Sequence, residues 1–147
     1  MKTKIAIITF LCLLLSASGS PEDEADFKER FEKFVAEKDA ALISTIWQQE
    51  ESPLSTLFEF KSKFQIAAFA GVSEIVFRDI EPEFIEHLKK DTLKDGNYYI
   101  LSGTPYRLVE IKLKETLKND AFTGFGMITG FKDGKLYILG LKKTEKK

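Results

Sequence analysis

The chain has 147 residues, of which 44% are apolar and 31% charged, and its formal net charge is −1. This length allows one domain, and the apolar fraction is that of a globular protein, which excludes a disordered chain. A single cysteine excludes a disulfide scaffold, and a nearly neutral chain has no electrostatic basis for binding nucleic acid.

The first nineteen residues have the pattern of a secretory signal peptide. Lys2 and Lys4 precede an apolar run over residues 5–15, and small residues follow it. The run is shorter than the roughly 20 residues that cross a bilayer. We therefore expect residues 1–19 to be removed, and residues 20–147 to form one secreted or periplasmic domain with a Lys-rich, frayed C-terminus.

Cys12 lies within this apolar run, directly after the bulky Phe10 and Leu11. Lipid attachment to a bacterial lipoprotein cysteine requires small residues before it, so we expect no stable membrane anchor. Cleavage near residue 19 also leaves the mature chain without a cysteine. A disulfide, a thiolate nucleophile and a cysteine metal ligand are then excluded.

Charge is divided unevenly along the chain. Residues 21–96 contain 10 basic and 18 acidic side chains, whereas residues 97–147 contain 10 basic and 5 acidic ones. We interpret this as two parts of one fold that neutralise each other.

The acidic part is expected to be mainly helical. Phenylalanines recur with helical spacing from Phe27 to Phe34, which predicts an amphipathic helix with Asp23 as its N-cap. Asp39 is expected to cap a second helix, and residues 57–60 to form a short extended piece.

Two more helices are predicted before the strands begin. Ser62 and Gln65 have capping-box spacing, and apolar residues continue with helical spacing as far as Val76, with Gly71 as a residue that weakens this helix and could split it. Pro82 is expected in the first turn of a short helix that ends at Lys90. The side chains of that helix expected to face inward are Phe84, Ile85 and Leu88.

After Gly96 the pattern changes to the alternation that is typical of strands. Asp133-Gly134 is a strong hairpin signal, which joins the last two of the expected strands. The four expected strands are 98–101, 106–115, 122–132 and 135–143. Helices followed by antiparallel strands, without βαβ alternation, indicate an α+β fold in which N-terminal helices pack on a curved C-terminal antiparallel sheet.

The element order, the Phe-x3-Phe-x2-Phe helix and the closing Asp-Gly-Lys-Leu-Tyr-Ile-Leu-Gly-Leu strand resemble the nuclear-transport-factor-2-like, or ketosteroid-isomerase-like, cone fold, which includes small secreted bacterial proteins. Cystatin-like inhibitors share the layout, but their Gln-x-Val-x-Gly loop has no match here. The resemblance implies a pocket between helices and sheet, in which enzymes of this fold hold an acid or base with a tyrosine. No residue matches a family catalytic motif, so no catalytic role is carried over.

Few residues are candidates for chemistry. His87, the only histidine, lies on the flank of its short helix, where we expect it to be exposed. One histidine without a mature cysteine leaves almost no basis for a zinc site or a serine triad, and the acidic residues 79–86 lack a calcium-loop glycine. We therefore expect no catalytic residue, metal or cofactor. The candidate ligand-binding residues are Trp47, Asp79, Tyr98 and Tyr106, with Tyr99 as an alternative tyrosine.

We thus expect an exported, non-catalytic binding or interaction domain for a small apolar ligand or a protein partner. The alternative is a small-molecule isomerase, dehydratase or hydrolase of the cone-fold type with an apolar pocket. Inhibitors and immunity-type proteins fit the same sequence features.

The C-terminal hairpin also predicts self-association. Both of its faces are apolar, and only one can pack on the helices. We therefore expect a homodimer through the sheet, as is common among cone-fold relatives, although loops covering the second face are an alternative. The interface residues are expected to be Ile128, Tyr137, Leu139 and Leu141.

Overall fold

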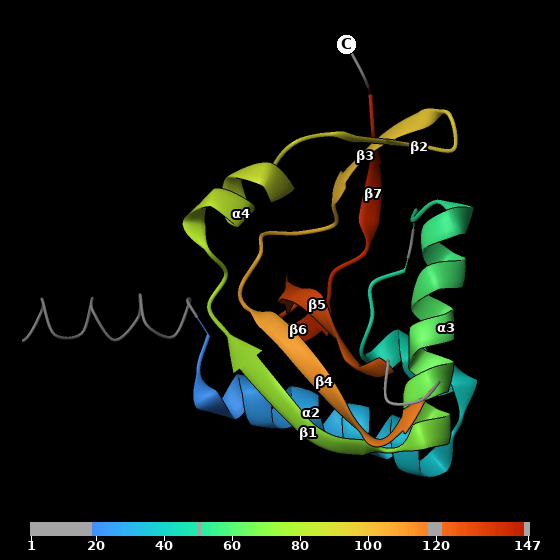
Figure 1. Cartoon of the computed structure of the whole chain (residues 1–147). Coiled ribbons are helices and arrows are strands. Elements are labelled where there is room, and N and C mark those ends of the chain that lie inside the picture. Colours follow the sequence, from blue (N-terminus) through green and yellow to red (C-terminus); the bar gives the residue numbers. More distant parts are fainter. Residues whose placement is uncertain (1–18, 50, 118–121, 146–147) are drawn as a thin grey trace, which may run out of the picture.

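In a computed structural model, the described part of the chain comprises residues 19–49, 51–117 and 122–145. N-terminal helices are followed by a curled antiparallel sheet that forms a half-barrel (Figure 1). The expected α+β class and the packing of helices on a curved sheet are confirmed.

Helix α2 (Pro21–Glu37) begins earlier than the sequence pattern predicted. Its N-cap is Ser20, not Asp23. The Ser20 Oγ accepts a hydrogen bond from the Asp23 amide, and the Ser20 amide donates to Asp23 Oδ2 at 2.9 Å. Because Pro21 occupies the first helical position, Asp23 is the third residue of the helix. There its carboxylate accepts from the N-cap amide and completes a capping box. The next expected cap is confirmed, since Asp39 caps the 3-10 helix η1 (Ala40–Thr45).

Helix α3 (Leu54–Ala70) corrects two predictions. Residues 57–60 are helical, not extended, and Ser62 lies in the helix interior and caps nothing. The helix starts directly after Pro53, whose fixed φ of −66° suits a helix start. The capping-box spacing is also compatible with an uninterrupted helix, which is why it misled the prediction.

The predicted helix does not continue to Val76. Gly71 ends α3 with a φ of +78°, and residues after it form strand β1 (Val72–Arg78), which is rich in β-branched side chains. Helix α4 (Pro82–Leu88) is confirmed, but Phe84 on it is exposed, not buried.

The strands form two sheets (Figure 1). A four-stranded sheet has the order β1-β4-β5-β6, and a three-stranded sheet has the order β2-β3-β7. Helix α2 packs against β1 and β6, and α3 packs against β4. The bounds of the remaining strands are β2 Thr92–Lys94, β3 Asn97–Leu101, β4 Leu108–Leu117, β5 Phe122–Lys132, β6 Lys135–Ile138 and β7 Leu141–Thr144.

The last predicted strand, 135–143, is split in two. The expected hairpin at Asp133-Gly134 forms, with Gly130 opposite Tyr137, but the chain leaves the first sheet after Ile138 and joins the second at β7. A Cβ atom on Gly140 would lie 1.9 Å from the carbonyl oxygen of Gln48. Only glycine fits this close approach, so the strand breaks at the seam between the two sheets.

Aromatic rings fill the space between the helices and the curled sheet. The indole of Trp47 lies 5.5 Å from the ring of Phe64, which in turn lies 6.2 Å from Phe31. The fully or almost fully buried rings of this cluster are Phe27, Phe31, Phe34, Phe64 and Trp47. The space where the resemblance implied a pocket is therefore occupied by packed side chains.

Ion pairs join the acidic and basic parts of the chain, as the charge pattern predicted. Arg107 lies 3.0 Å from Glu24 and 3.1 Å from Asp79, and Lys112 lies 3.5 Å from Glu74. The two parts neutralise each other within one fold.

Candidate functional site

The four residues predicted to bind a ligand do not share one site. Trp47 is buried in the core, and Tyr98 lies on β3 in the second sheet. Asp79 and Tyr106 do come close together. Asp79 pairs with Arg107, Tyr106 bonds to Glu24, and Arg107 pairs with Glu24 as well. The structure therefore brings together two of the four predicted residues.

Glu24 completes that cluster, although no pattern in the sequence marks it as a site residue. The Tyr106 hydroxyl donates to Glu24 Oε2 at 2.5 Å, and Arg107 Nη1 donates to the same oxygen at 3.0 Å. Burial and the bond to Glu24 raise the pKa of Tyr106 to about 12, and the same carboxylate raises the pKa of Arg107. Every charged group here has a partner, so the cluster joins α2 to the segment that directly precedes β4 and offers no free acid or base.

A hollow lies between α2, η1 and α3, and we call it the lysine hollow. Its volume is about 470 Å³, within the roughly 300–1,000 Å³ typical of small-molecule pockets. Phe34, Ile43 and Ala68 supply apolar walls. The polar side chains that line it are Lys38, Lys61, Gln49 and Gln65.

The two lysines of this hollow are available for a ligand. Lys38 is held there by the end of α2, where it adopts a left-handed φ of 55° and its amide donates to the Phe34 carbonyl at 2.8 Å. Within the described part of the chain, neither Lys38 nor Lys61 has an ion-pair partner, whereas the nearby Lys63 is paired with Glu59. The hollow therefore combines an apolar wall with uncompensated positive charge.

Exposed apolar side chains follow the same face of α3. Leu54, Phe58, Lys61, Gln65 and Phe69 are spaced three or four residues apart, so they form one stripe along the helix. Phe58 is 65% exposed and Phe69 77% exposed. Because Lys61 and Gln65 also line the lysine hollow, large exposed rings flank its opening. The sequence pattern of α3 by itself predicts neither the exposure of this stripe nor the hollow, because both depend on how α2 and η1 pack against the helix.

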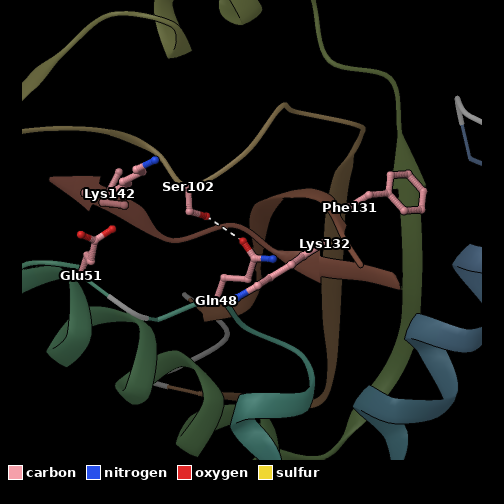
Figure 2. Close-up of a pocket in the computed structure, with 7 residues that line it drawn as sticks. Gln48, Glu51, Ser102, Phe131, Lys132 and Lys142 are labelled. Atoms are coloured by element: carbon pink, nitrogen blue, oxygen red, sulfur yellow. Dashed lines mark hydrogen bonds between the residues drawn. The ribbon is translucent and has the colours of Figure 1, made fainter. Parts of the chain in front are cut away.

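A second, smaller hollow lies at the seam between the two sheets, and we call it the seam hollow (Figure 2). Its volume is about 230 Å³. The Ser102 hydroxyl donates to Gln48 Oε1 at 3.0 Å and accepts from the Gly140 amide at 3.1 Å. The remaining residues that line it are Glu51, Phe131, Lys132, Leu141 and Lys142.

The described residues give no arrangement for nucleophilic or metal-assisted chemistry. Ser102 bonds to an amide side chain and a backbone group, neither of which is a base. His87 lies on α4, exposed as expected, with its ring stacked on Phe84 at 6.4 Å between centroids. No cluster of three or more His, Cys, Asp or Glu side chains that could bind a metal occurs in residues 19–49, 51–117 or 122–145.

The residues expected at a dimer interface lie on or near the outer face of the hairpin. Leu139 is only 2% exposed, because the loop at Gly103 and Thr104 covers it. Tyr137 packs against the Arg30 guanidinium at 5.3 Å, and Ile128 is half-buried. Leu141, also half-buried, borders the seam hollow. Cover by a loop, the alternative to a dimer, therefore accounts for part of this apolar face.

None of the helices in the described residues has the length and apolar character needed to span a membrane. Comparison of the chain with protein-family models, with curated proteins and with solved structures found no match. The cone-fold resemblance therefore stays an expectation from the sequence.

Proposed function

We propose that this protein is a non-catalytic binding domain and that the lysine hollow binds an amphipathic anion, namely an apolar body with one carboxylate. The observation that carries the proposal is the pairing of an apolar wall with Lys38 and Lys61, which have no acidic partner among the described residues. The apolar part of such a ligand would replace water on Ala40 and Ala68, and its carboxylate would bond to the lysines.

The lining of the hollow favours binding over the enzymatic alternative. The described residues that line it include lysines and amides but no carboxylate, histidine or hydroxyl group. Lysine is thus the one residue type of the described lining that could act as a general acid or base, and a lysine ammonium group without an acidic partner is suited instead to binding an anion. The exposed Phe58 and Phe69 extend the apolar surface beyond the hollow, which suits a ligand with a long apolar body.

Titration calorimetry with sodium dodecanoate tests this proposal. We expect the double variant Lys38→Gln/Lys61→Gln to bind at least tenfold more weakly, since each lysine supplies a charge-assisted bond. Lys33→Gln/Lys90→Gln, which removes two exposed lysines elsewhere, should bind like the wild type. Dodecylamine carries the opposite charge and should bind weakly.

A variant that fills the hollow gives a second test. Ala68→Phe should abolish dodecanoate binding, whereas Ala36→Phe on the exposed side of α2 should have no effect. Equal affinity for dodecanoate and dodecylamine, or full binding by Ala68→Phe, would contradict the proposal.

We also propose that the protein acts outside the cytoplasm. The support is the cationic start, apolar run and small-residue exit of residues 1–19. The intact mass of protein purified from its host should lack these residues, and a mass that retains Met1 would refute export with cleavage.

A further inference from the structure

The seam hollow has charged groups of both signs around a small space. Figure 2 places Glu51 and Lys142 at one end, Gln48 and Ser102 in the middle, and Phe131 at the far end. No ion pair joins Glu51 to Lys142 in the described structure. Each of these two charges is therefore available to a molecule that enters the hollow.

Gln48 adds a hydrogen-bond donor that no described residue uses. Its Oε1 accepts the Ser102 hydroxyl, but its Nε2 is buried and has no partner among the described residues. Buried donors are almost always bonded, because an unpaired one loses its contact with water and gains nothing. Rotation of the Gln48 side chain toward the hollow would bring this donor to a ligand oxygen and satisfy it.

Glu51 occupies a position where glycine or asparagine is usual. The Ser52 amide donates to the Gln49 carbonyl at 3.1 Å, which closes a turn in which Glu51 is the third residue. Its φ is +59°, in the left-handed region. A long acidic side chain gives no conformational benefit at this position, so the backbone conformation does not account for its presence.

We propose that the seam hollow binds a free amino acid with a small apolar side chain. The ligand carboxylate bonds to Lys142 and, once the Gln48 side chain rotates toward the hollow, to Gln48 Nε2. Its ammonium group pairs with Glu51, and its side chain packs on Leu141 and Phe131. The volume of about 230 Å³ lies below the roughly 300 Å³ at which drug-sized pockets begin, which fits a ligand of this size. This site is separate from the lysine hollow, so neither proposal depends on the other.

The probe is L-leucine, titrated by calorimetry into the purified protein at pH 7. Two analogues divide its charges: 4-methylpentanoate has the carboxylate without the ammonium group, and 3-methylbutylamine has the ammonium group alone. We expect L-leucine to bind at least tenfold more tightly than either analogue, because only the zwitterion contacts both Glu51 and Lys142. Absence of leucine binding, or equal binding of 4-methylpentanoate, would overturn the proposal.

Variants of the chain test the assigned contacts. Lys142→Gln should weaken leucine binding at least tenfold, whereas Lys143→Gln should not, because successive side chains on β7 point to opposite faces. Glu51→Gly should weaken binding equally while the melting temperature stays the same or rises, since glycine suits the positive φ. Equal effects of Lys142→Gln and Lys143→Gln would show that only overall charge matters and would refute the site.

Discussion

At the scale of single residues, two buried threonines differ in one respect that decides their effect on stability. Thr129 is fully buried, and its hydroxyl donates to the Arg107 carbonyl at 2.7 Å. Thr56 is 2% exposed on the inner side of α3, and its hydroxyl has no partner in the described part of the chain. A buried hydroxyl without a hydrogen bond destabilises the folded state, so the two residues contribute with opposite sign.

Thr56→Val should therefore raise the free energy of unfolding by about 1 kcal/mol, because valine has a similar shape and no polar atom to desolvate. Thr129→Val should lower it by about 1–2 kcal/mol, since the Arg107 carbonyl loses the hydroxyl donor and keeps only the Thr129 amide. Urea denaturation of both variants at pH 7 measures the two changes. If Thr56→Val were the more destabilising of the pair, Thr56 would have a bonding partner after all.

At the scale of elements, predictions succeeded where the determining interactions are local. The Asp133-Gly134 turn fixed the hairpin register because both turn residues favour left-handed conformations, and Asp133 has a φ of +51°. Residues 72–76 were assigned to the wrong element because a short apolar run has no period that separates a strand from a helix. Pairing with β4, more than 30 residues later in the chain, makes them a strand.

The candidate sites were less predictable than the elements for the same reason. Gln48, Ser102 and Lys142 meet only because Gly140 lets β7 leave the first sheet, and no local signal reports that crossing. In the lysine hollow, the helix-ending position of Lys38 has a local signal, but its proximity to Lys61 depends on packing between α2 and α3.

The contact between α2 and the segment that directly precedes β4 should weaken at alkaline pH. The folded state raises the pKa of Tyr106 from 10.0 to about 12, through burial and the bond to Glu24. A raised pKa stabilises the fold below pH 10, and this contribution is lost as pH rises from about 10 through 12. Tyr106→Phe should thus lower the free energy of unfolding by about 1 kcal/mol at pH 8 and by less at pH 11.

Urea denaturation at pH 8, 10 and 11 measures this difference. Tyr137→Phe is the matched control, because no hydrogen bond from the Tyr137 hydroxyl occurs among the described contacts. If the gap between wild type and Tyr106→Phe stayed constant to pH 11, the bond to Glu24 would not control the titration of Tyr106.

At the scale of the whole molecule, charge and aromatic content predicted more than the motifs did. The uneven distribution of charge led us to expect that the two parts of the chain neutralise each other, and the acidic part does meet the basic part through ion pairs of Arg107 and Lys112. The abundance of phenylalanine was equally compatible with a lined cavity or a filled core. Phe27, Phe31 and Phe64 are fully buried, so the core is filled. The available hollows therefore lie at the margins of the half-barrel.

The homodimer through the hairpin remains a prediction at this scale, and the structure changes how it must be tested. Leu139 lies beneath the loop at Gly103, so a charge there would disturb the monomer itself. Ile128 is half-buried on the same outer face and is the better position.

Sedimentation of residues 20–147 at micromolar concentration should give about twice the monomer mass. Ile128→Glu should halve that mass, whereas Thr123→Glu at the exposed start of β5 should not. A wild-type monomer throughout this range would mean that the loop at Gly103 satisfies the apolar face within one chain.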